Sequence, residues 1–448
     1  MGKWRTRIGY GVGDLGCNLV FSTMSSYLLF FYTDVFGITA AVAGTLMLVT
    51  KVVDAFTDTG MGLLVDRTKT RWGQGRPYFI IGAIPFFLFT ILTFIVPDFD
   101  MTGKVIWAYV TYCLLCTAYT VVNIPLNTIV PRLTSDNHER NVLVSSRMIC
   151  ALIGTALVMS ITMPMVNFFG QGDTQKGFLI TMGIYGFVAM LIFVFTFMNT
   201  KEVIPPSVSP GKSSLKQDLK GLTDQTIIFF VINFLYFALF VTRNTTVIYY
   251  FTYNLERTDW LTFVGLFGIL SGLPILFILP WLQKNMSKKN VLMLSAAIYI
   301  VGDLMIYFGK TSPALLIAGL AITGLGIYGI FGSTFAIQPD VIDYSEYKKK
   351  KSIAGMIAAF QGFAVKGSMG LASAFIGMLL NIGGYVPNVE QTATALGYIE
   401  FSFIWLPIII CLLLMVTMSF YKLDKKRKEM DIELANRRSG EQASVVNM

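Results

Sequence analysis

The chain has 448 residues, of which 54% are hydrophobic and only 14% are charged, and its mean hydropathy is +0.63. A soluble protein of this size would need far more charge to cover its surface. The composition therefore excludes a soluble globular enzyme and predicts an all-α polytopic membrane protein. The net charge of +9 does not indicate nucleic-acid binding, because the basic residues gather in short stretches between long apolar runs.

The apolar runs are about 20 residues long, which is enough to cross a bilayer as a helix, and Gly, Pro, Asn or charged residues separate them. They predict twelve transmembrane helices near residues 8–33, 38–65, 77–97, 104–131, 143–168, 177–199, 226–252, 258–283, 290–309, 312–337, 354–382 and 397–421. A polar connector divides these helices into two halves. The predicted organisation is an N-terminal six-helix bundle (1–200), a cytoplasmic linker (201–225), a C-terminal six-helix bundle (226–421) and a cytoplasmic tail (422–448).

Lysine and arginine fall almost entirely on one side of the predicted helices. The opposite side carries only Lys104, Lys176, Arg257 and Lys310. Cytoplasmic loops of membrane proteins carry the excess of Lys and Arg, so we expect both termini in the cytoplasm. The expected location is a multi-pass protein of a bacterial-type inner cell membrane, surrounded by membrane lipid.

Two carboxylates interrupt the second predicted helix. Asp54 and Asp58 are four residues apart and so lie on the same helix face, and an ionised side chain at the middle of a bilayer costs roughly 2.5–3.5 kcal/mol on insertion scales. Such a pair must share a proton, bind a cation or contact a fixed positive charge. With the Thr57 hydroxyl, it suits Na⁺ or H⁺, and Li⁺ would also fit. The alternative is a local ion pair between Lys51 and Asp54.

Amides repeat this four-residue spacing in the fourth predicted helix, at Asn123 and Asn127. Amides that project together suit a neutral polyhydroxy ligand, but they also pair helices within membranes, and the sequence leaves both interpretations open. Arg243 and Lys366 are intramembrane cations of the second half. The single histidine, His138, lies in a loop, and no phosphate-binding loop motif is present. We therefore expect no catalytic site, no direct use of ATP and no cofactor besides a coupling cation.

Longer motifs follow one another along the chain: YTDVFGI, DAFTD, GLLVDRTKTRWGQGRPY, VNIPLN, PDVIDYSEY and GYVPNVEQ. In order and spacing they resemble the glycoside–pentoside–hexuronide:cation symporter family, a melibiose permease-like branch of the major facilitator superfamily, from about residue 8 to 438. The resemblance implies two six-helix bundles around a substrate cavity that work by alternating access. It also implies cation-coupled symport of a pentoside, hexoside or hexuronide.

The resemblance assigns roles to individual residues. It implies a cation site that could bind Na⁺. The residues of this site are Asp54, Asp58, Thr57 and Thr120. Substrate contacts are expected from Asn18, Asn123, Asn127, Arg147, Arg243 and Lys366. Gating ion pairs between the halves are expected from Asp66, Arg67, Arg71, Arg140, Asp340, Asp343 and Glu346. Where melibiose permease has two sugar-binding acids, this chain has Asn18 and Asn123, which leaves pentosides, β-glycosides and hexuronides open in place of melibiose.

Two other functions compete with sugar symport. A cation-coupled carrier of lipids or other amphiphiles would share the acids of the second helix, but the GYVPNVEQ and RWGQGRPY motifs favour sugars. A transport-like membrane sugar sensor would need a cytoplasmic signalling domain, whereas the tail at 422–448 is short. The expected partners are a small glycoside, a coupling cation and membrane lipid, without nucleic acid, and we expect the carrier to function as a monomer.

Overall fold

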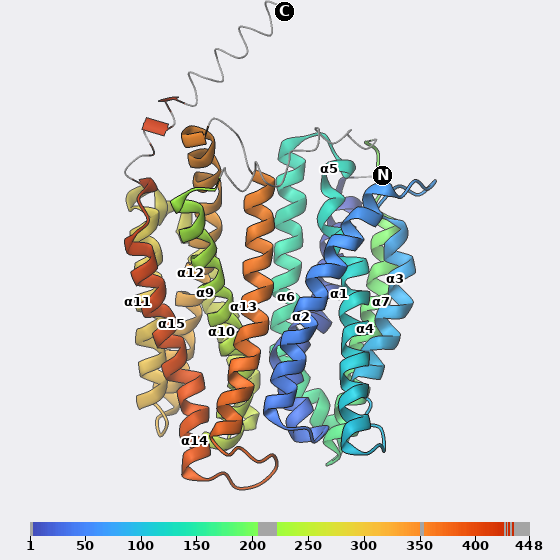
Figure 1. The fold of residues 1–448 in the computed structure, drawn as a ribbon, viewed down its shortest axis with the longest axis vertical. Coiled ribbons are helices and arrows are strands. Elements are labelled where there is room, and N and C mark those ends of the chain that lie inside the picture. The colour runs from blue at the N-terminus through green and yellow to red at the C-terminus, as the bar shows by residue number, and fades with distance from the viewer. Residues whose placement is uncertain are drawn as a thin grey trace, which may run out of the picture. The chain divides into compact units, whose positions relative to one another are not determined.

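The computed structural model describes residues 3–204, 222–349 and 354–424, and, in the tail, residues 427, 429, 430, 432 and 433. These residues are almost entirely helical (Figure 1). The first half contains α1 (Lys3–Phe30), α2 (Ala40–Arg67), α3 (Pro77–Thr93), α4 (Met101–Thr128), α5 (Val130–Leu133), α6 (Asn137–Gly170) and α7 (Thr174–Asn199). The second half contains α9 (Asp224–Tyr249), α10 (Leu261–Asn285), α11 (Lys288–Phe308), α12 (Pro313–Lys349), α13 (Ala354–Ile382), α14 (Ala393–Glu400) and α15 (Leu406–Ser419).

Short turns of other helix types extend or join these helices. A π-helical turn, η1 (Phe31–Val35), continues α1, and a second, η2 (Tyr250–Asn254), continues α9. A third, η4 (Phe401–Trp405), joins α14 to α15, and the 3₁₀ turn η3 (Thr258–Trp260) precedes α10. Because π turns inside or beside α-helices are often found at functional sites, the ends of α1 and α9 are of particular interest.

Ten helical segments of the described residues are long and apolar enough to cross a membrane. Two further predicted spans coincide with α3, an apolar helix of 17 residues, and α10, a helix of 25 residues. The all-helical membrane fold predicted from composition is therefore confirmed. Most of the predicted linker, at 205–221, and the end of the tail lie outside the described residues.

Short polar side chains determine where several helices begin. The Thr39 hydroxyl accepts a hydrogen bond from the backbone N–H of Val42 at the start of α2. The Asp100 carboxylate accepts one from the N–H of Gly103 at the start of α4, at 3.0 Å. Such caps satisfy N–H groups that have no partner within the first helical turn. The cap on α2 thus stabilises the first turn of the helix that carries the predicted cation site.

The chain divides into two compact units. The first unit contains residues 1–208, 241–269 and 369–403, and the second contains residues 209–240, 270–368 and 404–448. Parts of α9, α10, α13 and α14 therefore belong to the same compact unit as the first six long helices. The functional division into bundles at 1–200 and 226–421 stays a prediction.

Within the first unit, α1 packs against α6 and α7, α3 packs against α4 and α7, and α2 packs against α4. Glycine allows α13 to approach α2 closely. A Cβ atom on Gly377 would lie 2.3 Å from the carbonyl oxygen of Ala40, and one on Gly370 would lie 3.1 Å from the Cβ of Lys51. A larger residue at Gly377 would force the helices apart, so the glycines hold α13 beside the segment of α2 that carries Lys51.

The second unit has its own apolar core. Helix α11 packs against α12 and α15. The buried side chains that fill this core include Phe229, Tyr236, Tyr299, Ile337 and Leu414. Burial of large aromatic rings contributes much of the packing in such a core, and it holds the carboxyl-terminal part of α12, with its acidic residues, in place.

Candidate functional site

The predicted cation residues lie on α2 and on the facing helix α4. Asp54 is buried, and its Oδ2 accepts a hydrogen bond from Lys51 Nζ at 3.0 Å. Asp58, one turn later, accepts through Oδ1 a hydrogen bond from the Thr120 hydroxyl of α4 at 2.8 Å. The Thr57 hydroxyl donates to the backbone carbonyl of Asp54 at 3.2 Å. The structure therefore brings Asp58 and Thr120 together, and it contains the Lys51–Asp54 ion pair that the sequence allowed as an alternative.

These groups suit a hard cation by their chemistry. Two carboxylates and two hydroxyls provide oxygen ligands of the kind that Na⁺ prefers. The side chains of Lys51 and Asp54 are only 13% and 8% exposed, so their attraction is poorly screened by water. The ammonium of Lys51 thus supplies Asp54 with a positive charge that belongs to the protein itself.

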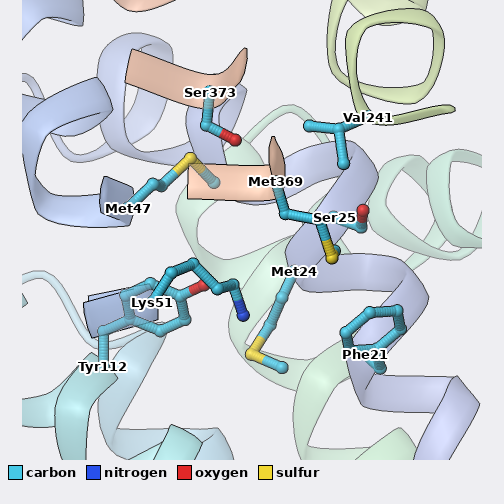
Figure 2. Close-up of a pocket in the computed structure, with 9 residues that line it drawn as sticks. All are labelled: Phe21, Met24, Ser25, Met47, Lys51, Tyr112, Val241, Met369 and Ser373. Atoms are coloured by element: carbon cyan, nitrogen blue, oxygen red, sulfur yellow. The ribbon is translucent and has the colours of Figure 1, made fainter. Parts of the chain in front are cut away.

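Lys51 also lies in the wall of a small pocket of the first unit (Figure 2). The pocket is lined by Phe21, Met24, Ser25, Met47, Lys51, Tyr112, Val241, Met369 and Ser373. The Phe21 ring lies 5.9 Å from Lys51 Nζ and stacks on Tyr119, with centroids 5.5 Å apart. Methionine and aromatic side chains surround a few polar atoms, as in many small-ligand sites. The residues come from α1, α2, α4, α9 and α13.

Four of the six predicted substrate residues meet around Arg147 of α6. Its Nε lies 3.2 Å from Asp14 Oδ2 on α1, and its Nη1 donates to Asn127 Oδ1 on α4. The Asn127 amide in turn donates to Asn123 Oδ1 at 2.7 Å. Asn18 donates to the backbone carbonyl of Asp14 at 2.8 Å. The four predicted residues therefore share one hydrogen-bonded group, which we call the Arg147 cluster: Asp14, Asn18, Asn123, Asn127 and Arg147.

The Arg147 cluster is balanced in charge. Asp14 carries one negative charge and Arg147 one positive charge, and their side chains are 9% and 21% exposed. The three asparagines are neutral and offer both donors and acceptors. A guanidinium that already has a carboxylate partner exerts a weaker net attraction on an anionic ligand. The cluster can therefore recognise hydroxyl groups without demanding a charged sugar.

The two other predicted substrate cations are Arg243 and Lys366. Arg243 of α9 is buried, its guanidinium carbon lies 4.0 Å from the ring centroid of Phe403, and its Nη1 donates to the Phe403 carbonyl at 3.5 Å. Lys366 of α13 is half-buried and belongs to the second unit. The contacts of both residues with a substrate stay predictions.

The predicted gating residues of the first half lie at helix ends or in the connection between α2 and α3: Asp66, Arg67, Arg71 and Arg140. Asp66 Oδ1 lies 3.5 Å from Arg132 Nη2, but the Asp66 side chain is 69% exposed, so this pair contributes little. Arg140 Nε donates to the Thr134 carbonyl at 2.9 Å. These contacts organise the turn before α6 within the first unit.

The predicted gating residues of the second half follow one another on α12: Asp340, Asp343 and Glu346. The buried Asp340 accepts hydrogen bonds from Lys288 at 2.7 Å, from the Tyr421 hydroxyl at 3.1 Å and from Arg427. Arg427 also pairs with Asp343 at 3.4 Å. Burial and the neighbouring Asp340 raise the pKa of Tyr421, so its hydroxyl remains a donor at neutral pH. These pairs form within the second unit, and ion pairs between the two halves stay a prediction.

Comparison with known proteins now identifies the family. A family model described as MFS/sugar transport protein matches residues 9–425. An isoprimeverose transporter of Lactiplantibacillus pentosus is 37% identical, over 99% of this chain and 94% of its own length. A putative glycoside/cation symporter of Escherichia coli is 33% identical, over 95% of this chain and 93% of its own. The chain belongs to the glycoside–pentoside–hexuronide:cation symporter family.

Solved structures agree with this symporter in fold alone. The structure of a nucleoside transporter matches 94% of this chain and 100% of its own chain, with a TM-score of 0.65 and 15% sequence identity. A bacterial homologue of human drug peptide transporters covers 94% and is matched over 98% of its own chain, with a TM-score of 0.68 at 12% identity. The major facilitator fold and the function in sugar:cation symport that the motifs predicted are therefore confirmed for this membrane protein.

Two residues that organise the candidate site and a neighbouring loop are absent from the sequence prediction. Asp14 received no role, although an acid in an apolar helix four residues before Asn18 was a usable signal. The sequence gives no comparable signal for Glu202. Its carboxylate accepts hydrogen bonds from the backbone N–H groups of Gln74, Gly75 and Arg76 at 3.0, 2.8 and 3.1 Å. Glu202 thereby anchors the RWGQGRPY loop to the end of α7. A glycine-rich loop allows such a contact, but its sequence does not predict it.

Proposed function

We propose that this symporter carries an uncharged glycoside, held by the Arg147 cluster, and that the coupling cation binds at Asp54 and Asp58. The observation that carries the substrate class is the ion pair between Arg147 and Asp14 at 3.2 Å. Because the guanidinium is already balanced by a carboxylate, selection of an anionic sugar would have to rely on another cation. The relative named an isoprimeverose transporter, whose sugar is an uncharged disaccharide, agrees with this choice.

The competing substrate is a hexuronide. A glucuronide carrier protein homolog of Escherichia coli is 28% identical, over 99% of this chain. A hexuronide would place its carboxylate near Arg147, where it would compete with Asp14 for the same guanidinium. Two carboxylates that share one guanidinium repel each other, which disfavours this substrate relative to a neutral one.

The coupling step begins on α2. Asp58 and the Thr120 hydroxyl, 2.8 Å apart, provide the first ligands of a cation that is carried with the sugar. Lys51 competes with that cation for Asp54, since its ammonium lies at hydrogen-bond distance from the carboxylate. Na⁺ would therefore have to displace Lys51 before it could use both acids, whereas a proton would need Asp58 alone.

The transport cycle follows from the family fold. Both termini face the cytoplasm, the protein works as a monomer, and the first and second halves rock about the central site. Asp66, Arg67, Arg71 and Arg140 of the first half would meet Asp340, Asp343 and Glu346 of the second half when the cytoplasmic side closes. In that step Asp340 would exchange its present partners for partners across the cavity.

Thermal stabilisation of the purified symporter tests the substrate class and the cation together. Ligands of the folded state raise the melting temperature, by an amount that grows with the logarithm of their concentration relative to Kd. Isoprimeverose, other neutral glycosides and methyl β-D-glucuronide are compared, each in NaCl, LiCl and choline chloride. We expect stabilisation by a neutral glycoside and none by the glucuronide. Stabilisation by the glucuronide alone would overturn the proposed substrate class.

A further inference from the structure

Two sequence motifs without a role so far meet in the first unit. YTDVFGI, at 32–38, forms most of the turn η1 that continues α1, together with the three residues after it. GYVPNVEQ, at 384–391, forms the loop between α13 and α14. Their meeting point is Asp34. The motifs are separated by about 350 residues of chain, as the hydrogen bond between Tyr385 and Asp34 shows, so their contact joins the first and second halves of the sequence.

Asp34 is the centre of a buried hydrogen-bonded group. Its side chain is largely buried, with the residue 8% exposed. Oδ1 accepts hydrogen bonds from the Tyr385 hydroxyl at 2.6 Å and from the Tyr253 hydroxyl, and Oδ2 accepts one from the Thr33 hydroxyl at 2.6 Å. The Asn388 amide donates to the backbone carbonyl of Asp34. We call this group the Asp34 cluster: Thr33, Asp34, Tyr253, Tyr385 and Asn388.

The backbone is shaped to present these side chains. Asp34 lies in the π turn η1 and Tyr253 in the π turn η2. Asn388 has a φ of 59°, a left-handed conformation that few residues other than Gly and Asn adopt readily, and its N–H donates to the Tyr253 hydroxyl at 3.2 Å. Gln391 closes the loop by donating to the Val389 carbonyl at 2.8 Å. The turns η1 and η2 and the loop between α13 and α14 thus all have irregular backbone, and each places a group of the cluster at the Asp34 carboxylate or beside it.

We propose that the Asp34 cluster is the latch of a gate, which holds the ends of α1, α9 and α13 together on the side of the membrane opposite the termini. Alternating access requires these ends to part when the carrier opens to that side, so this inference rests on the proposed transport cycle. In the closed state the carboxylate has hydroxyl donors, and in the open state water replaces them. Exchange of one set of hydrogen bonds for another has a small net free energy, which lets the gate reopen.

The Tyr385 hydroxyl of the latch keeps its proton over a wide range of pH. Burial raises the pKa of the Tyr385 hydroxyl well above its ordinary value, and the nearby Tyr249 and Asp34 raise it further. Tyr385 therefore stays protonated and continues to donate at neutral and mildly alkaline pH. Tyr249 extends the group, since its hydroxyl lies 2.9 Å from the Thr33 hydroxyl.

Opening of the gate can be measured by the labelling rate of a cysteine introduced at Ser25. Ser25 of α1 lines the pocket (Figure 2). It lies nine residues before Asp34 of η1, which is about 13–14 Å along a helix. Ser25→Cys is labelled in intact cells with a membrane-impermeant maleimide, and the labelled peptide is measured by mass spectrometry to separate it from the native cysteines. Adding Tyr385→Phe removes one donor to Asp34, and we expect the labelling rate to rise about fivefold. Asp34→Asn should raise it at least as much.

Tyr27→Phe is the matched control. The Tyr27 hydroxyl is also buried, but it donates to the Met159 carbonyl of α6 at 3.3 Å, so its loss weakens a contact within the first half alone. We expect Tyr27→Phe to leave the labelling rate unchanged. Unchanged labelling in both Tyr385→Phe and Asp34→Asn, with normal amounts in the membrane, would overturn the latch. So would an equal rise in Tyr27→Phe. The measurement needs neither sugar nor cation, so it does not depend on the proposed substrate.

Discussion

Replacement of Lys51 by methionine removes the protein's own positive charge from Asp54 and retains most of the side-chain volume. At the 3.0 Å separation of Nζ and Oδ2, the attraction between the charges is roughly 5–6 kcal/mol at an effective dielectric constant of about 20. Loss of one partner of a buried ion pair costs about 3–5 kcal/mol. Only part of this ion-pair free energy has to be given up when Na⁺ binds to Asp54. If that part is about 1.4 kcal/mol, Lys51→Met should bind Na⁺ about tenfold more tightly than the wild-type protein does.

The assay is the melting temperature of the purified symporter in increasing NaCl, with choline chloride holding the ionic strength constant. In choline chloride, Lys51→Met should melt below the wild-type protein, because Asp54 has lost this partner. NaCl should then restore its stability, with a midpoint about tenfold lower than that of the wild-type protein. Lys51→Arg keeps the charge and should resemble the wild type.

Arg7→Met controls for the general loss of a partly buried ion pair. Arg7 Nη2 lies 2.6 Å from Glu139 Oε2, and these side chains are 20% and 8% exposed, but the pair lies at the start of α1 and α6. This variant should lower the melting temperature without moving the NaCl midpoint. The competition between Lys51 and Na⁺ is refuted if Lys51→Met keeps the wild-type midpoint, or if Arg7→Met shifts the midpoint by the same factor.

Four further variants test the cation site, the Arg147 cluster and the anchored loop. Asp58→Asn should abolish uphill sugar accumulation and keep equilibrium exchange, because Thr120 can still bond the amide while the charge is lost; normal accumulation would contradict the cation site. Arg147→Ala should abolish stabilisation by a neutral glycoside, and unchanged affinity would remove this residue from the substrate site. Asp14→Asn should instead let methyl β-D-glucuronide bind, which the same melting assay detects. Glu202→Gln weakens three hydrogen bonds to backbone N–H groups and should lower the free energy of unfolding by about 1–3 kcal/mol; a loop no more sensitive to protease than in the wild type would count against this anchor.

The helices and the acids on one helix could be predicted from the sequence for a simple physical reason. Runs of apolar residues report directly on a bilayer of fixed thickness, and a four-residue spacing places Asp54 and Asp58 on one face by helix geometry alone. The contact of Asp58 with Thr120 could be predicted only through the family resemblance, because nothing in the periodicity of α2 states which helix it faces.

Contacts between distant segments could not be predicted in this way. The residues of the Arg147–Asp14 pair are 133 positions apart, and those of the Tyr385–Asp34 pair are 351 positions apart. Each depends on how several helices pack, and a single chain carries no local signal of that packing. YTDVFGI and GYVPNVEQ were visible as motifs, but their meeting at Asp34 required the structure.

The glycines between α2 and α13 have a mechanical consequence for coupling. At Gly377 the backbone of α13 faces the backbone of α2 at Ala40 and Gly44, without a side chain between them, whereas at Gly370 it faces the side chains of Leu48 and Lys51. A side chain can absorb a small displacement by changing its rotamer, but a backbone in direct contact transmits it. A shift of α2 when Lys51 releases Asp54 would therefore pass directly to the carboxyl-terminal part of α13, from residue 369 on, which belongs to the same compact unit as α2.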